Sequence, residues 1–327
     1  MLGPRYSRYV FLLSSVIVCF FFSSSLCGRP ADHAVAADSY VNGNHLYDEN
    51  RFTEAVAAYQ QAISQDPQFA EAYHNLALAE EMVDRQKAMQ DWQRFIDVGA
   101  QKSELKFDVA RAQARLQLEK DMPALPDAMQ PSHYVSGAGD YYWQIAEDSD
   151  GNQWKNFPVS VYLGAAPAAK WIEGTRDAFN IWKAMIPMQL VADQDSADIR
   201  VLWDVSPEES GHIGEESDWV KMVRVGNQTV TRRVCNITVD WQMRNWTKDE
   251  MQAIILHEMG HALGINGHSD STKDIMYFQM QDKKHQVYVP RSPMPVFWRS
   301  LVKQPSQRDI NTLIRLYNSP GLGKRLP

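Results

Sequence analysis

The pattern of apolar and polar positions divides the chain into a helical first part and a mixed second part. Residues 31–122 contain seventeen alanines and almost no glycine, and their apolar spacing is typical of helices. Beyond them, apolar runs at 157–163 and 197–203 predict strands, and residues 168–186 predict an amphipathic helix. Two further runs, 219–225 and 233–241, predict a hairpin around Gly226-Asn227.

A unit of about 34 residues occurs twice in the helical part. The first copy covers residues 42–67 and ends on Asp66-Pro67, and the second begins at Ala70 and continues less regularly through Phe95. Small residues where helices cross and aromatic residues where neighbours interlock resemble the tetratricopeptide repeat (TPR). Residues 103–120 predict a closing helix with Ser103 as its N-cap.

Two interpretations of the repeats remain open. The resemblance implies a concave surface that binds a protein or peptide partner. Alternatively, the helices are a spacer that packs on the following domain. Three prolines within residues 123–131 cannot continue a helix, so we place a linker at residues 121–135.

The first 27 residues have the pattern of a secretory signal peptide. Arg5 and Arg8 precede an apolar run over residues 10–22, and small residues follow at 23–28. The pattern predicts an exported protein, whether secreted, periplasmic or extracellular. The alternative is an uncleaved membrane anchor, and we expect no other contact with a membrane.

Charge and cysteine content narrow the classes of function and the sources of stability. Lysine and arginine number 33 against 40 acidic residues, a net charge of −7, which disfavours nucleic acid as a partner. Without residues 1–27 only Cys235 remains, so no internal disulfide can form. Stability must therefore come from packed cores and from bound metal.

The candidate chemistry lies on a helix that begins at a capping box of Thr247 and Glu250. His257 and His261 are four residues apart, so both imidazoles leave the same face of this helix and can reach one zinc ion. Glu258 projects beside such a metal, where it can take a proton from water.

A third imidazole follows the end of that helix. Gly264 suits the C-terminal end of a helix, and the turn after it can present His268. Three histidines and a water molecule form an open catalytic site, whereas a structural zinc site has four protein ligands. A lone histidine is usually a solvated or core residue, but this spacing makes coincidence a poor explanation.

Residues 257–264, His-Glu-Met-Gly-His-Ala-Leu-Gly, resemble the signature of the metzincin zinc proteases, in their matrixin-like (peptidase M10-type) branch. The family's methionine turn is matched at 271–277, with Met276 as the apolar floor beneath the three imidazoles. Residues 306–317 resemble the family's C-terminal helix. The family's usual spacing would put the third histidine at Gly267, so a turn longer by one residue must bring His268 to the metal.

The resemblance implies an N-terminal all-α TPR domain and a C-terminal α/β (α+β) metzincin, or zincin-like, domain. The latter has a twisted mixed sheet and an active-site helix. It also implies Zn²⁺ held by His257, His261 and His268, with Glu258 as general base. An extended protein or peptide substrate would lie along the strand at 219–225, and Tyr277 and Phe278 would line its specificity pocket.

These expectations assign residues 1–27 to a signal peptide, 37–120 to TPR-like repeats, 121–135 to the linker and 136–320 to the protease domain. The expected function is that of a secreted zinc metalloendopeptidase whose repeats bind a protein partner. The alternative is a repeat-based interaction protein that carries a catalytically idle protease fold. We also expect the two domains to be separable, so that loss of residues 28–122 leaves peptide cleavage intact.

Overall fold

The computed structural model describes most of the chain after the N-terminal segment. The described residues are 30–121, 124–149, 153–204, 214–225, 228–240, 246–277, 302–319 and 325–327. The expected signal peptide at 1–27 and the pocket residue Phe278 lie outside them. Within these ranges, no helix has both the length and the apolar character needed to cross a membrane.

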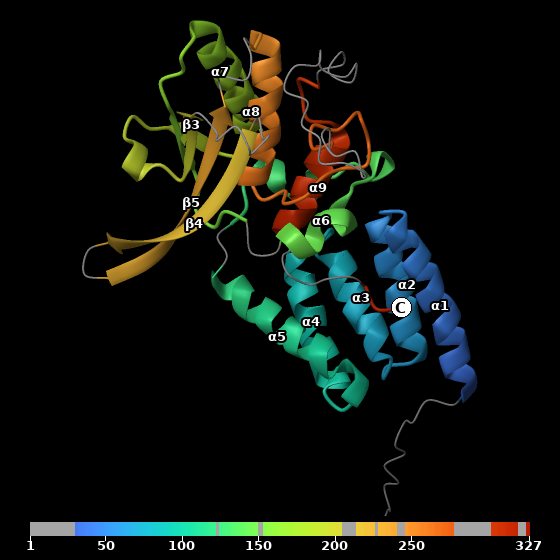
Figure 1. Cartoon of the computed structure of the whole chain (residues 1–327). Helices are drawn as coiled ribbons and strands as arrows, with labels where there is room; N and C mark the ends of the chain where they lie inside the picture. Colours follow the sequence, from blue (N-terminus) through green and yellow to red (C-terminus); the bar gives the residue numbers. More distant parts are fainter. Residues whose placement is uncertain are drawn as a thin grey trace, which may run out of the picture.

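The N-terminal domain is a stack of antiparallel helices (Figure 1). Its core holds small residues and aromatic rings, among them Ala55, Tyr59, Ala77 and Trp92, all fully or almost fully buried. These are the helix-crossing and interlocking positions of the repeat. The helices are α1 (Pro30–Asp48), α2 (Phe52–Gln65), α3 (Ala70–Glu80), α4 (Arg85–Gly99) and α5 (Lys106–Asp121).

The closing helix of the stack starts differently from the prediction. A 3-10 turn, Ser103–Leu105, leads into α5. The N-cap residue of this turn is Lys102, whose side chain makes no capping hydrogen bond. The Ser103 hydroxyl instead donates to the Glu104 carboxylate at 3.3 Å. The predicted Ser103 cap is therefore wrong, because the short 3-10 turn satisfies the backbone that a cap would have bonded.

The second domain contains a five-stranded sheet of order β2-β1-β3-β5-β4. Four strands run parallel, and β4 pairs antiparallel with β5 at one edge, so the predicted mixed sheet is confirmed. The predicted hairpin is longer than its apolar runs and extends the edge strand well beyond them. The strands are β1 (Val159–Leu163), β2 (Met188–Leu190), β3 (Ile199–Asp204), β4 (Gly214–Val225) and β5 (Gln228–Asp240).

Two packed helices cover the sheet, α7 (Ala169–Lys183) and α8 (Lys248–Ala262) (Figure 1). They approach closely at Gly174, where a Cβ atom would lie 2.5 Å from the carbonyl oxygen of Lys248. The indole of Trp182 on α7 donates to the carbonyl of Leu256 on α8 at 2.9 Å. These contacts fix α8, the helix of the candidate chemistry, against α7.

The helices α6 (Tyr142–Ser149) and α9 (Gln307–Asn318) lie between the repeats and the sheet domain (Figure 1). The segment predicted as a linker contributes Leu125 and Met129 to the core of the second domain. Conversely, Ile314 on α9 belongs to the core of the repeats. The two domains therefore share a buried interface, which does not fit the expectation that they are separable.

Candidate metal centre

The capping box predicted at the start of α8 is present. Thr247 Oγ1 accepts from the Glu250 N–H at 3.2 Å, and the Glu250 carboxylate accepts from the Thr247 N–H at 2.8 Å. The helix ends at Ala262, and Gly264 follows with a φ of 111°, as expected for a residue that reverses the chain. This start and end place His257 and His261 in the last two turns of α8.

The three predicted histidines converge on one point. The ring centroids of His257 and His261 are 4.8 Å apart. The ring centroid of His268 lies 5.3 Å from that of His257 and 5.1 Å from that of His261. One nitrogen from each ring lies within 4.8 Å of the others, close enough for a single ion. His268 therefore joins the pair on α8 despite the extra residue in the turn.

Backbone carbonyl groups determine which nitrogen each helical imidazole offers. His257 Nδ1 lies 2.8 Å from the carbonyl oxygen of Ile275, and His261 Nδ1 lies 2.7 Å from that of Ile265. A carbonyl oxygen only accepts, so in both rings Nδ1 carries the proton and Nε2 keeps its lone pair. Hydrogen bonds of this kind orient histidine ligands of metal ions.

Glycine makes the longer turn to His268 possible. Gly267 has a φ of 131°, and a Cβ atom there would lie 2.6 Å from Cγ2 of Ile145 on α6. The turn is then fixed after His268, where the Ser269 N–H donates to the carbonyl of Met276 at 2.8 Å. Ser269 and Tyr277 also form a parallel bridge, so the loop that carries His268 is paired with the methionine turn.

Burial keeps the cluster in the state that a metal requires. It lowers the pKa of His257, and it lowers the pKa of His261 to about 3 and that of His268 to about 4. The proximity of His257 lowers the latter two further, because two imidazolium charges would repel each other. At neutral pH all three rings are therefore uncharged, which is the state in which histidine binds a zinc ion.

The methionine turn passes directly beneath α8. Met276 is fully buried, and a Cβ atom on Gly260 would lie only 2.3 Å from its sulfur. Gly260 stands between the two helical histidines, so the thioether occupies the space that a side chain at 260 would need. The contact places Met276 against the backbone of α8 between His257 and His261; its role as the floor beneath the imidazoles stays a prediction.

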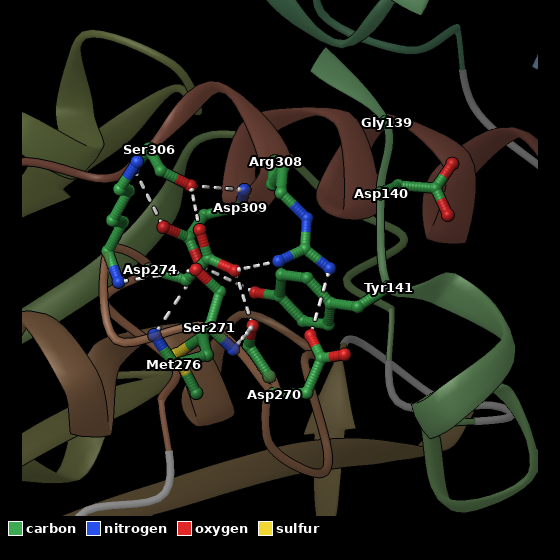
Figure 2. A network of polar contacts seen from close by, with 12 residues as sticks. Gly139, Asp140, Tyr141, Asp270, Ser271, Asp274, Met276, Ser306, Arg308 and Asp309 are labelled. Carbon is green, nitrogen blue, oxygen red and sulfur yellow. Dashed lines mark hydrogen bonds and ion pairs between the residues drawn. The ribbon is translucent and has the colours of Figure 1, made fainter.

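A buried carboxylate supports the methionine turn, as Figure 2 shows. Asp309, at the start of α9, accepts from the N–H groups of Ile275 and Met276 at 2.9 and 3.4 Å. It also accepts from the Ser306 N–H at 2.7 Å and from the Tyr141 hydroxyl at 2.6 Å. Asp309 therefore connects the floor of the histidine cluster to α9 and to the segment before α6.

Asp274 forms a second connection between the turn and α9. Its carboxylate accepts from Ser306 Oγ at 2.7 Å and pairs with Arg308 at 2.8 Å, and it also bonds to Ser269. Arg308 reaches Asp270 as well, at 3.1 Å (Figure 2). The loop after His268 and the methionine turn are thus held by the same end of α9.

The other predicted site residues are placed as follows. Glu258 is half-buried on α8, next to His257. Tyr277 is half-buried at the end of the methionine turn, and its N–H donates to the carbonyl of Asp274 at 3.2 Å. Phe278, the second predicted pocket residue, lies outside the described residues, as do residues 279–301 that follow it.

Comparison with known protein families agrees with both halves of this architecture. The family model described as matrixin matches residues 155–292, and the model described as TPR repeat matches residues 43–82. The chain carries a matrixin domain behind a TPR domain. A search of curated proteins finds no match. The matrixin domain supports a metalloprotease, the matrixin family is zinc-dependent, and the three converging imidazoles lie within the matched residues.

The sequence interpretation missed the residues that support the matrixin site from below. Ser306 and Asp309 have the three-residue spacing of a capping box, which the structure confirms, but this spacing says nothing about the methionine turn. Tyr141 gives no local signal at all. Asp309 and Tyr141 support the methionine turn only because α9 lies against that turn, and these two segments are more than thirty residues apart in the sequence.

Arg315 is a further residue whose role no local pattern indicated. It is fully buried near the C-terminal end of α9, where it pairs with Asp140 at 3.0 Å and bonds to Asn50 and Tyr47 of the repeats. Four aromatic rings lie within 5.2 Å of the guanidinium carbon, those of Tyr47, Phe52, Tyr142 and Trp143. This helix therefore contacts the methionine turn at one end and the TPR domain at the other.

Proposed function

We propose that the protein is an exported, zinc-dependent endopeptidase whose TPR domain binds a protein partner. The observation that carries this proposal is the convergence of His257, His261 and His268, each uncharged at neutral pH, inside a matrixin domain. Three protein ligands leave one position for water or substrate, which is typical of a catalytic rather than a structural zinc site.

The residues around this centre suit hydrolysis of a peptide bond. A bound Zn²⁺ would polarise the scissile carbonyl group and lower the pKa of a water molecule to roughly 7. Glu258, beside His257 on α8, would accept the proton of that water and return it to the leaving amine. Ile275 and Ile265 hold the proton on Nδ1 of the two helical imidazoles, so that these rings stay oriented throughout.

The sheet offers a place for an extended substrate. Among the described strands, β4 is the outer one on one side of the sheet, and the outer side of its backbone pairs with no other described strand, so it can offer main-chain hydrogen bonds to an extended substrate. Tyr277, together with Phe278, is our candidate for one wall of the pocket that receives a substrate side chain. Its position directly after the methionine turn, close to the histidine cluster, supports this assignment.

Cleavage of an unfolded protein by the purified full chain tests the proposal. Activity should disappear with a chelator and return when zinc is added. Glu258→Ala should bind one zinc per chain but lose at least about 1,000-fold in rate, because the general base is gone. His261→Ala, the matched control, should lose the metal itself. A folded, zinc-loaded native chain that cleaves no unfolded protein would instead support the idle-protease alternative.

Export rests on the sequence of residues 1–27 alone. The charged start, the apolar run and the small residues after it support removal of this segment during secretion. N-terminal sequencing of the exported protein should give a first residue near position 28. A product that still begins at Met1 and sediments with membranes would show that the segment is an anchor.

A further inference from the structure

Residues 325–327 lie against two helices of the TPR domain. Residues 325–327 lie beside α1 and α3, and the C mark in Figure 1 lies between the labels of these two helices. Asn75 on α3 binds both backbone groups of one residue: its amide nitrogen is 2.9 Å from the Leu326 carbonyl oxygen, and its oxygen accepts from the Leu326 N–H at 2.8 Å. This pairing recognises an extended backbone whatever side chain it carries.

The contact surface is ordered by the repeats themselves. Asn75 is fully buried, and Asn44 Oδ1 lies 2.9 Å from its amide nitrogen. The Tyr59 hydroxyl donates to the same oxygen of Asn44 at 2.9 Å and so fixes its orientation. The Tyr40 hydroxyl, against the ring of Phe69, lies 2.9 Å from the Leu326 carbonyl oxygen. A preorganised set of polar groups loses little entropy when a peptide binds.

Two side chains of the segment are also recognised. The Arg325 guanidinium forms a bidentate ion pair with Asp48 at the end of α1, with distances of 2.9 and 2.6 Å. Leu326 packs against the apolar core of the repeats. The repeat region is acidic as a whole, with ten basic and sixteen acidic residues in 28–122. The surface therefore matches a basic residue followed by an aliphatic one.

We propose that the surface formed by Tyr40, Asp48 and Asn75 is a peptide-binding site for extended segments with a basic residue followed by leucine. Residues 325–327 are its tethered internal occupant, and a partner protein with such a segment binds by displacing them. This deepens the interaction role proposed above for the repeats. It does not depend on peptide-bond hydrolysis, so either proposal can fail alone.

Because residues 325–327 belong to the same chain as the site, a partner needs a high affinity in order to displace them. A short connection gives a tethered ligand an effective concentration on the order of millimolar. A free peptide of the same sequence therefore binds the intact chain weakly, and removal of the internal occupant raises its affinity. The occupant thus acts as a threshold that excludes weak ligands.

Fluorescence anisotropy with a labelled peptide of sequence Gly-Leu-Gly-Lys-Arg-Leu-Pro tests the site. Zinc-loaded Glu258→Ala protein is used so that the probe stays intact. A variant that lacks residues 325–327 should bind the peptide at least about tenfold more tightly than the full chain, because the tethered competitor is absent. Equal or weaker binding by the shortened chain overturns the proposal.

Charge reversal tests the same site without touching a buried residue. In the shortened chain, Asp48→Lys should weaken binding of the peptide about three- to tenfold, since a bidentate ion pair is replaced by repulsion. A peptide with Glu in place of Arg should then bind Asp48→Lys better than it binds the parent. Asp97→Lys, at an exposed acid on α4, should change neither affinity. If Asp48→Lys does not change the preference between the Arg peptide and the Glu peptide, the assignment of Asp48 to the site is contradicted.

Discussion

Gly260 and Met276 are in direct contact: a Cβ atom at position 260 would lie 2.3 Å from the methionine sulfur and 3.2 Å from its methyl carbon. The glycine between the two histidines of α8 is therefore required by the turn beneath it. Because the backbone of α8 and the buried thioether touch, the height of the methionine turn is linked to the position of the imidazoles.

Gly260→Ala should destabilise the protein by about 1–3 kcal/mol and weaken zinc binding, because Met276 must move from its buried place. Urea unfolding and competition with a zinc indicator measure the two effects. Gly137→Ala is the matched control, since a Cβ atom there meets nothing within 4 Å. If both variants behave alike, the contact with Met276 does not restrict the site.

Asp309→Ala should be among the most damaging single changes in the matrixin domain. It removes the acceptor for Ile275, Met276 and the Tyr141 hydroxyl and leaves these buried donors unpaired, at a cost of about 3–5 kcal/mol in the free energy of unfolding. Zinc affinity should fall with it, because His257 is oriented by the carbonyl of Ile275.

Asp249→Ala is the control for this change. Its carboxylate is about half exposed and pairs only with Lys303 among the ion pairs of the described residues. Its loss should cost less than about 1 kcal/mol. Equal losses of zinc affinity in the two variants would refute a specific role of Asp309 under the metal centre.

Arg315→Met should destabilise both domains together by about 3–5 kcal/mol, since it leaves Asp140 charged and buried without its partner. Denaturant unfolding followed by far-ultraviolet circular dichroism measures the loss. The double variant Arg315→Met/Asp140→Asn should recover part of it, because no charge then remains unpaired. Arg176→Met, at an exposed position on α7, should be nearly neutral.

The same interface predicts the effect of removing the repeats. A chain without residues 28–122 loses Tyr47 and Phe52, which cover Arg315 on α9. We expect it to be less stable and to bind zinc less tightly than the full chain, since α9 also supports the methionine turn. Full zinc affinity and full peptide cleavage by the shortened chain would restore the modular interpretation.

The burial of His74 should make the stability of the TPR domain sensitive to acid. His74 is buried beside Trp92 and Phe95, and burial lowers its pKa from 6.5 to about 4. Between these values the unfolded chain binds a proton that the folded chain does not, so stability is present above pH 6.5 and is lost as the pH falls towards 4. The loss approaches about 3 kcal/mol for this group.

Thermal unfolding of native protein and His74→Phe across pH 4–7 measures this contribution. The native curve should fall more steeply on acidification than that of the variant, which cannot take up the proton. Glu80, whose pKa burial raises to about 6, acts in the opposite direction in both proteins and cancels in the difference. His45→Gln, at an exposed histidine, should follow the native curve. Parallel curves for native protein and His74→Phe would show that His74 binds its proton equally in the folded and unfolded states, which contradicts a lowered pKa in the folded protein.

Local patterns in the sequence were sufficient to predict many of the helices and strands and several residues of the candidate site. The capping box at Thr247, the four-residue spacing of His257 and His261, and Gly264 at the helix end depend on neighbours along the chain, and all are present. The order of strands and helices follows from the same kind of signal. Such features are local because backbone hydrogen bonding and side-chain periodicity act over a few residues.

One prediction failed for a local reason and another because of a contact between distant segments. Ser103 is not a cap because a 3-10 turn begins at this residue, whereas the proline-rich stretch places Leu125 and Met129 in the core of the second domain instead of forming a free linker. Composition identifies where helices end, but it does not say which surface the intervening residues will cover.

The sequence by itself determined the repeats, the helix that carries His257 and His261, and the three histidines that are candidates for zinc ligands. Only the tertiary structure decided that His268 reaches the other two imidazoles, that Asp309 supports the methionine turn, and that Asn75 holds the chain's own residues 325–327. The physical reason is that each of these contacts joins groups whose separation along the chain is bridged only by packing, so no periodicity or spacing records it.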